Sequence, residues 1–258
     1  MRVLSDQHRD DVLTKGFTVV RDAVDPAVAA SWRKALAVLV QRQRTRLTDR
    51  TAVDDYMVHN PMLDDPCFFD ALEHPAVVDA LDTFLSNTSI IYAFTTSSMP
   101  AGGSNYSRRV HVDCPRVIPG YITNLGVIIA LDDFTEDNGA TYFLPGSFER
   151  TDAPTDDEFF AGAERVFPRR GDLVVFNART FHYGGLNTTS EDRHALTINA
   201  CRSYMRQRFD YPRMVSPEMA GSMSPTLRRL LGFDVRVPTS LDDYYLPEDQ
   251  RLYKANQG

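Results

Sequence analysis

Three side chains of the sequence have residue types and a spacing that suit a metal ion. His111 and Asp113 are separated by one residue in a segment expected to be extended, so both project from the same face. Because the chain has 6 His and 35 Asp+Glu, such a pair arises easily by chance and needs a third ligand. His182 follows the apolar run Leu173–Asn177, at the end of an expected strand. Two imidazoles and one carboxylate form the facial triad that binds non-haem Fe(II) and leaves positions open for a cosubstrate and O2.

A fourth candidate is Arg193, at the start of another expected strand. The period of two places it on one face with Ala195, Thr197 and Asn199, and places Leu196 and Ile198 on the other face. A guanidinium enclosed among small and polar residues needs an anionic partner, because an unpaired buried charge is costly. The distal carboxylate of 2-oxoglutarate can supply that partner in a bidentate pair.

The elements that must position these residues fall into two blocks. Helices are expected over Ser5–Thr14, from Asp25-Pro26 towards Gln43, and over Pro66–Leu85, with a strand at Phe17–Val20. Strands are expected at Ile90–Thr96, Tyr121–Leu131, Ala140–Leu144, Leu173–Asn177 and Ala195–Tyr204. Several short strands in one block indicate a closed or two-sheet β architecture.

Four segments of the chain resemble the phytanoyl-CoA dioxygenase family of Fe(II)/2-oxoglutarate oxygenases. They are HVD at 111–113, ALDDFTEDNGATYFLPGSF at 130–148, GDLVVFNARTFHYGG at 171–185, and the arginine at 193; GFTVVRDAVDP at 16–26 also resembles the start of that family. The resemblance implies a mixed β fold with a helical buttress, in which a double-stranded β-helix (a cupin-like jelly roll) follows N-terminal helices. It also implies that His111, Asp113 and His182 bind iron and that Arg193 binds the cosubstrate.

The resemblance leaves other cosubstrate contacts open. A polar or aromatic residue on the strand before HVD is expected to touch the head of 2-oxoglutarate, and Tyr92, Thr96 and Ser98 are the candidates. The second position after the distal histidine, often a small hydroxyl residue in the family, is Gly184. Thr197 is a candidate to make that contact instead.

The loop 101–110 and the segment 42–60 are polar and irregular, and the resemblance places them near the site as candidate lids. Arg108 and Arg109 in the first of them could pair with a substrate anion, although solvated arginines on a flexible loop are an equal alternative. We expect a small metabolite as substrate, such as an amino-acid-like molecule or a natural-product scaffold, and hydroxylation as the reaction. Desaturation, epoxidation and ring formation stay open.

Two other classes of function fit the same residues. One is a jelly-roll protein that binds or senses a ligand and has lost turnover. The other is a zinc hydrolase, because two histidines and a carboxylate also suit Zn²⁺. An intact triad together with Arg193 favours the oxygenase, since Arg193 has an evident task only if 2-oxoglutarate binds.

Composition limits the partners. The 258 residues carry a formal net charge of -7, which gives no basic field for nucleic acid or an anionic membrane surface. Three cysteines without a CxxC pair indicate free thiols. The charged N-terminus lacks the apolar core of a signal peptide, so we expect a cytoplasmic protein. We expect it to be a monomer or a homodimer. We expect one domain over 1–258, with a helix-rich part (1–87), a jelly-roll core (about 88–205) and a C-terminal extension (206–258).

Overall fold

The computed structural model describes residues 3–46, 56–252 and 254. Its α-helices are α1 (Asp6–Thr14), α2 (Pro26–Arg46), α3 (Cys67–Leu72), α4 (Pro75–Phe84), α5 (Asp156–Gly162), α6 (Tyr211–Met214), α7 (Pro217–Ser222), α8 (Pro225–Leu230) and α9 (Leu241–Tyr244). Its strands are β1 (Phe17–Val20), β2 (Ile90–Thr96), β3 (Asn124–Ala130), β4 (Thr141–Phe143), β5 (Glu164–Arg165), β6 (Leu173–Asn177), β7 (His182–Gly184) and β8 (Ala195–Cys201). Short 3-10 turns lie at Pro61–Leu63, Ser147–Glu149 and Glu248–Gln250.

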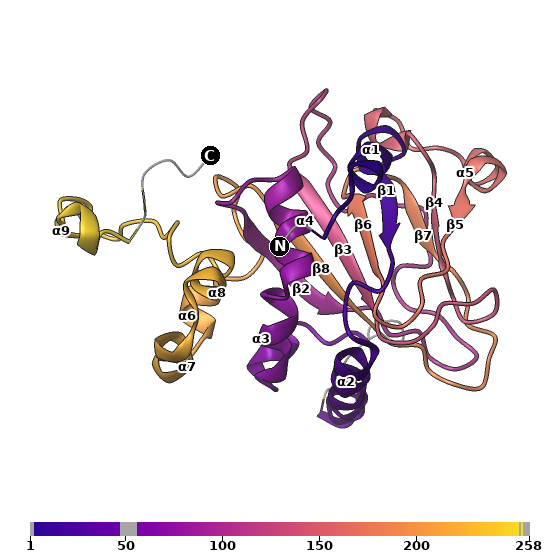
Figure 1. The fold of residues 1–258 in the computed structure, drawn as a ribbon, viewed down its shortest axis with the longest axis horizontal. Coiled ribbons are helices and arrows are strands. Elements are labelled where there is room, and N and C mark those ends of the chain that lie inside the picture. Colours follow the sequence, from indigo (N-terminus) through magenta and orange to yellow (C-terminus); the bar gives the residue numbers. More distant parts are fainter. Residues whose placement is uncertain (1–2, 47–55, 253, 255–258) are drawn as a thin grey trace.

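The strands form two sheets (Figure 1). The larger has the order β1-β6-β3-β8-β2 and the smaller the order β5-β4-β7, and every pairing is antiparallel. An isolated bridge between His111 and His182 extends the smaller sheet beyond β7. The aromatic ring of Phe143 on β4 lies 5.2 Å from that of Phe176 on β6, so the two sheets face each other. The expected jelly-roll fold is confirmed, with sheets that do not close into a barrel.

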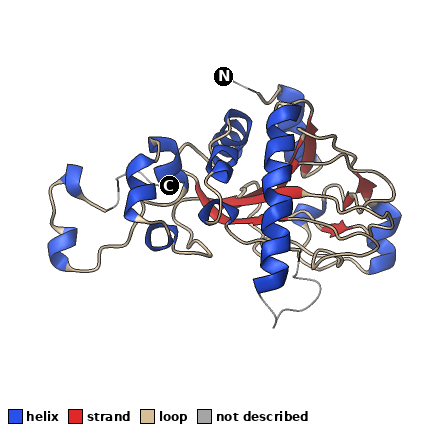
Figure 2. Cartoon of the chain, turned by 90° about the horizontal axis from the view of Figure 1, so that it is seen from below, coloured by secondary structure: helices blue, strands red, loops and turns tan. Residues whose placement is uncertain are grey.

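The two faces of the larger sheet pack differently. The outer face joins the helices in the main core cluster, which includes Leu125, Val127 and Ile129 of β3 and Leu196 and Ile198 of β8. Helices α2, α3, α4 and α8 contribute to the same cluster and lie over the sheet (Figure 2). The inner face belongs to a second, smaller cluster between the sheets, with Ile128, Ala130, Val174, Phe176 and Ala195. The helices therefore stabilise the sheet from outside and leave the space between the sheets for other groups.

Helix α2 begins where its sequence predicts. The side chain of Asp25 accepts the amide N–H of Ala27, so one of the unpaired donors at the helix start is satisfied. Pro26 follows at the first helical position.

The helical segment expected over Pro66–Leu85 forms two helices, α3 and α4, with a break at Glu73 and His74. Pro75 has no N–H to continue the first helix. The ring of His74 instead accepts the N–H of Ala76 and starts the second.

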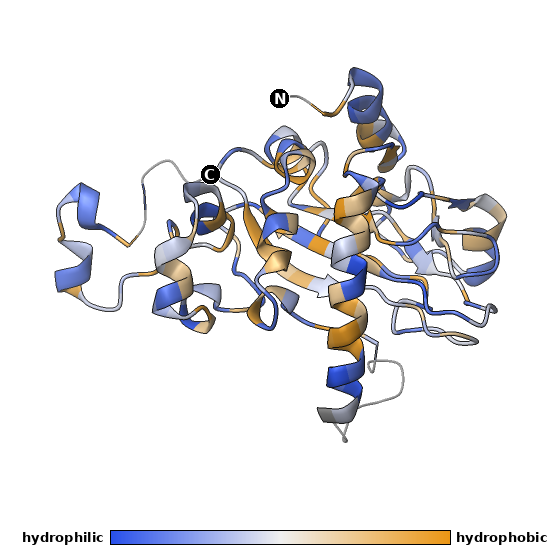
Figure 3. Ribbon diagram, turned by 60° about the horizontal axis from the view of Figure 1, so that its bottom comes forward, coloured by the Kyte–Doolittle hydropathy of each residue, from blue (hydrophilic) through white to orange (hydrophobic). Residues whose placement is uncertain are grey.

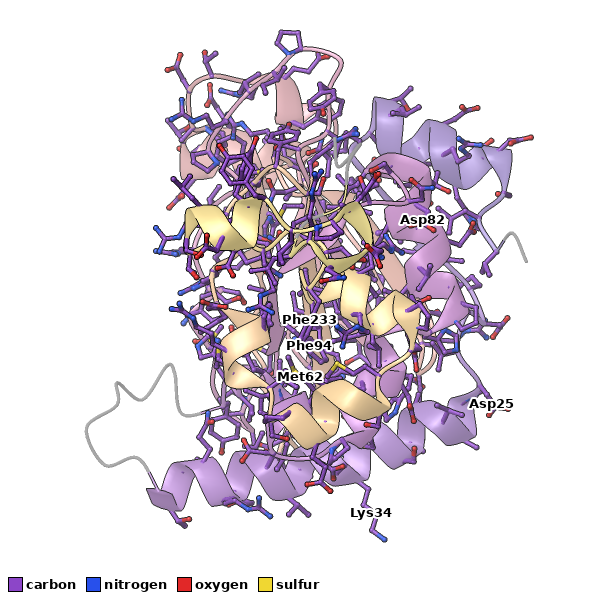
Figure 4. All side chains as sticks on the ribbon, turned by 90° about the vertical axis from the view of Figure 1, so that its left-hand side faces the viewer. Asp25, Lys34, Met62, Asp82, Phe94 and Phe233 are labelled. Carbon is purple, nitrogen blue, oxygen red and sulfur yellow. The ribbon has the colours of Figure 1, made fainter. Side chains whose placement is uncertain are left out.

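The C-terminal segment packs against the core where it begins, and its last helix, α9, lies away from the core. Tyr211 is fully buried, and its hydroxyl accepts the backbone N–H of Phe94 at 3.1 Å. Phe233 packs against the core cluster that contains Met62 and Phe94 (Figure 4). The segment with α9 projects from the rest of the molecule and is mostly hydrophilic (Figure 3). Among the described residues no helix has the length and apolar character needed to cross a membrane.

Candidate metal centre

The structure brings His111, Asp113 and His182 together. Asp113 Oδ1 lies 3.7 Å from His111 Nε2 and 3.9 Å from His182 Nε2, and the two imidazole centroids are 4.1 Å apart. The three candidate ligand atoms all lie within 4.8 Å of one another. One ion can therefore touch all three side chains, as the spacing in the sequence predicts.

Backbone pairing holds these residues in place. The amide of His111 donates to the carbonyl of His182 at 3.1 Å, and the amide of His182 donates back at 2.9 Å. Asp113 is fixed by its own amide, which donates to the carbonyl of Ala178 at 2.9 Å. The extended backbone that places His111 and Asp113 on one face is thus tied directly to the strand that carries the third ligand.

The orientation of each imidazole is set by a backbone carbonyl. His111 Nδ1 donates to Arg109 O at 2.8 Å, and His182 Nδ1 donates to Thr180 O at 3.0 Å. Because a carbonyl can only accept, the proton of each neutral ring sits on Nδ1, and Nε2 keeps its lone pair for a metal. Both Nε2 atoms face Asp113.

The surroundings favour the neutral, metal-binding form of His111. Burial and the neighbouring His182 lower the pKa of His111 to about 4, so the ring is neutral at neutral pH. Its Nε2 is buried without a hydrogen-bond partner in the described part of the chain. A buried polar atom left in this way is costly unless a further group satisfies it. Two imidazole nitrogens and one carboxylate oxygen fit a divalent transition metal there.

Aromatic rings surround the third ligand. The ring of His182 lies 5.6 Å from that of Phe143 and 5.2 Å from that of Phe176. Gly126 on β3 makes room for this arrangement, because a Cβ at that position would overlap the Phe176 ring. The packing fixes His182 and keeps water from one side of the triad.

Arg193 is buried, with 2% of its surface exposed. Its guanidinium donates to Ser97 O at 3.1 Å, to Gly139 O at 3.2 Å and to Asn138 O at 3.4 Å, and it lies 4.0 Å from the centre of the Phe134 ring. Burial lowers its pKa to about 9. A guanidinium has five N–H groups, so two remain after these three bonds. Two donors are what a bidentate carboxylate requires.

Other polar groups lie on the same inner face of β8. Thr197 Oγ1 is buried and has no hydrogen-bond partner among the described residues. Asn199 accepts a hydrogen bond from Asn124 on β3 at 3.2 Å, while Asn124 Oδ1 is itself buried and unsatisfied within the described structure. Leu196 and Ile198 belong to the outer cluster, so the division of faces expected from the sequence is present.

The candidates on the strand before the triad take different positions. Tyr92 is half-buried and is the extra residue of a β-bulge between Ile91 and Ala93. The hydroxyl of Thr96 accepts the amide of Val58 at 3.0 Å. Ser98 Oγ lies 2.8 Å from His194 Nδ1, a contact that gives this serine a structural partner. Their assignment to 2-oxoglutarate stays a prediction.

The loop 101–110 lies against β7. A Cβ at Gly184 would overlap the hydroxyl of Ser107 in the loop. Ser107 therefore places a hydroxyl group beside position 184, where glycine itself has none. Arg108 is exposed and donates from Nε to the Tyr183 hydroxyl at 3.2 Å. Arg109 is exposed, and its carbonyl orients His111. In the other expected lid, residues 47–55 lie outside the described residues.

Two further polar residues in the interior are not predicted by the sequence patterns above. Asn124 starts β3 and faces the space between the sheets, where it donates a hydrogen bond to Asn199. The strand period predicted this face for Asn199 but not for Asn124. Arg179 is 6% exposed, three positions before His182. The signal was a cation inside the segment 173–182, which has no other Lys, Arg, Asp or Glu, and strand periodicity alone does not single it out.

Comparisons with known proteins identify a family and relatives of the chain. A family model described as phytanoyl-CoA dioxygenase matches residues 13–195. The uncharacterized protein Rv1501 of Mycobacterium tuberculosis is 34% identical over 261 residues, which cover 98% of this chain and 96% of that protein. The dioxygenase af480 of Aspergillus fumigatus is 28% identical over 172 residues, covering 63% of this chain and 53% of the fungal protein.

A solved structure extends the likeness to the fold. The crystal structure of EctD from S. alaskensis with 2-oxoglutarate and 5-hydroxyectoine has a TM-score of 0.67 at 16% sequence identity, covering 78% of this chain and 77% of EctD. At that identity the likeness concerns the fold alone. The family model spans more than half of the chain and includes all three triad residues. The chain therefore belongs to the phytanoyl-CoA dioxygenase family.

Proposed function

We propose that the protein is an Fe(II)- and 2-oxoglutarate-dependent oxygenase that hydroxylates a small metabolite. Family membership supports a non-haem iron oxygenase. The observation that carries the finer proposal is the inner face of the fold. On this face His111, Asp113 and His182 form a His-Asp-His group, and Nε2 of His111 is unsatisfied. The buried Arg193 has two unused N–H groups.

In this proposal His111, Asp113 and His182 hold the iron. Bound there with 2-oxoglutarate and O2, the iron supplies the oxidation of the substrate, with release of succinate and CO2. Asp113 completes the ligand set, so no position is vacated for halide, and oxygen insertion is expected rather than halogenation.

The cosubstrate is positioned by Arg193, just before β8, and by a residue of β8. Arg193 pairs with the distal carboxylate of 2-oxoglutarate through its two remaining N–H groups. Thr197 lies four residues further along the chain on the same face, and its unsatisfied Oγ1 can donate to the same ligand. Holding both ends of the cosubstrate fixes its geometry before the reaction. Phe143 and Phe176, which pack on His182, help to exclude water.

The test is succinate formation. Purified protein is given Fe(II), ascorbate, 2-oxoglutarate and O2, and a metabolite library is screened for compounds that stimulate succinate release. We expect at least one compound to do so and to gain one oxygen atom. Turnover that Zn²⁺ supports without O2 would indicate a hydrolase, and ligand binding without succinate would indicate a binding protein; either result refutes the proposal.

For the substrate side, Arg108 and Arg109 remain proposals, as does a small-molecule substrate handled by a monomer or homodimer. Arg108 is exposed and tied to Tyr183, which lies beside the distal histidine in sequence. Arg108→Ala or Arg109→Ala should weaken substrate binding while uncoupled 2-oxoglutarate turnover continues. Unchanged substrate affinity in both variants would leave these arginines as solvated cations.

A further inference from the structure

A cavity of about 350 Å³ is lined by none of the three triad residues and is used by none of the roles assigned above. Its walls come from α1, the loop 116–123, the turn at 148–149 and the end of β6. Leu13 and Ile118, both in its lining, are 57% and 46% exposed. Exposed large apolar side chains gathered at one cavity are characteristic of a binding site.

Arg179 gives this apolar cavity a charged wall. The side chain lines the cavity, and only 6% of its surface is exposed. One terminal nitrogen, Nη2, donates to the carbonyl of Arg150, and the guanidinium lies 5.3 Å from the centre of the Phe181 ring. Nε is buried and has no hydrogen-bond partner among the described residues. Most of the hydrogen-bonding capacity of the group is thus unused.

No carboxylate in the described chain neutralises this arginine. Glu149 is the acidic residue of the cavity wall, but it is exposed, and no ion pair within 4.0 Å joins it to Arg179. Burial lowers the pKa of Arg179, and no carboxylate offsets that effect. The guanidinium nevertheless stays charged at neutral pH. A buried, unpaired cation is costly, so an anion from outside would stabilise it.

The backbone joins this cavity to the triad. The amides of Asp113 and Cys114 both donate to the carbonyl of Ala178, the residue before Arg179, at 2.9 and 3.1 Å. Thr123 lines the cavity and lies 3.4 Å from the Cys114 sulfur through its hydroxyl. The cavity wall is therefore joined by hydrogen bonds to the backbone that carries the Asp113 ligand.

We propose that this cavity binds the carboxylate end of an anionic small molecule with an apolar body, with Arg179 as the anchor. We take this molecule to be the substrate, and that identification rests on the oxygenase function proposed above. Arg179 would form a charge-assisted pair with the carboxylate. Leu13, Ile118 and Phe148 would contact the apolar part.

The probe is hexanoate, compared with hexan-1-ol, which has the same chain and no charge. Binding to the full-length protein is measured by isothermal titration calorimetry and by ligand-observed NMR, without iron or 2-oxoglutarate. Hexanoate is expected to bind roughly tenfold or more tightly than hexan-1-ol, because a hydrogen bond to a charged group adds about 1.5–3 kcal/mol. Equal binding of the two, or no binding of hexanoate, overturns the proposal.

Three variants locate the contact. Arg179→Gln should lose the preference for hexanoate, and Arg179→Lys should keep part of it. Arg116→Gln is the matched control, because Arg116 lines the same cavity but is exposed, and it should retain at least half of the wild-type affinity. If Arg179→Gln does not fold, Ile118→Glu places a negative charge on an exposed position of the same wall and should weaken hexanoate more than hexan-1-ol. Wild-type preference in the Arg179→Gln or Ile118→Glu variant refutes the assignment.

This result is separable from the oxygenase proposal, since the binding measurement requires no turnover. Selective hexanoate binding by a protein that makes no succinate would refute the oxygenase and retain the carboxylate site. Succinate formation stimulated only by uncharged metabolites, without hexanoate binding, would refute the carboxylate site and retain the oxygenase.

Discussion

The outer and inner faces of the larger sheet differ in what they bury. On the outer face, Val127, Leu196 and Ile198 belong to the apolar cluster that the sheet shares with the helices, and each is fully buried. On the inner face, Thr197 and Asn124 place polar atoms in the interior without partners in the described structure. Adjacent residues of one strand thus belong to two different environments.

This difference separates stability from function. Apolar burial stabilises the fold by about 25 cal/mol per Å² removed from water. An unsatisfied buried polar group costs about 1–3 kcal/mol. Polar atoms on the inner face therefore lower the stability of the ligand-free protein, and ligands that satisfy them would recover that cost. The same reasoning applies to His111 Nε2 and to Arg193.

The largest effect is expected at the triad. His182→Ala removes one of three protein ligands, so succinate formation should fall at least about a thousandfold, in line with the loss of an essential catalytic group. His74→Asn is the control, because Asn can also cap α4 and His74 lies outside the triad. Succinate formation near the wild-type rate in His182→Ala would break the assignment of the inner face.

The next effect sharpens the outer side of the comparison. Ile198→Ala should lower the free energy of unfolding by about 2–5 kcal/mol, because it leaves a cavity among fully buried apolar groups. The folded variant should bind 2-oxoglutarate with the wild-type affinity. Chemical denaturation and a cosubstrate titration measure the two quantities. A strong loss of cosubstrate affinity would show that the two faces are not separable.

Arg193→Ala is expected to act on the cosubstrate. The change removes a charge-assisted contact worth about 1.5–3 kcal/mol, so the 2-oxoglutarate concentration for half-maximal turnover should rise by roughly one to two orders of magnitude. Arg193→Lys should restore part of the affinity, since a point charge cannot form the fork. An unchanged titration curve in Arg193→Ala would remove the role proposed for this residue.

The smallest effect is expected at Thr197, the neighbour of Ile198 on the opposite face. Thr197→Val keeps the shape and removes the unsatisfied hydroxyl, so the ligand-free protein should be as stable as the wild type or up to about 1 kcal/mol more stable. Cosubstrate affinity should fall by no more than roughly tenfold. A loss of stability above about 1 kcal/mol would mean that the hydroxyl has a structural partner.

Runs of β-branched and aromatic residues predicted much of the larger sheet, and a period of two predicted which residues share a face. Ile90–Thr96 and Leu173–Asn177 are strands with the predicted bounds, because β-branched and aromatic runs between turn residues have few alternatives. The same period placed Arg193 and Thr197 opposite Leu196 and Ile198. The position of the triad followed from motif spacing combined with family resemblance.

Other features did not follow from the spacing of apolar residues. The His74–Pro75 helix break is local and was readable from Pro75, but the apolar spacing concealed it. The Ser107 hydroxyl at Gly184 and the burial of Arg179 each depend on a loop meeting a strand far along the chain. Such meetings are fixed by tertiary packing, which no local pattern encodes.

The central claim is that the inner face binds iron and 2-oxoglutarate together, and anaerobic titration tests it most directly. Fe(II) and then 2-oxoglutarate are added to the wild type, His182→Ala and Arg193→Ala while the visible absorption is recorded. The account predicts a weak charge-transfer band in the wild type that saturates at one equivalent of iron, a much weaker dependence on 2-oxoglutarate in Arg193→Ala, and no band in His182→Ala. A wild type without the band, or an identical band in all three proteins, would contradict the account.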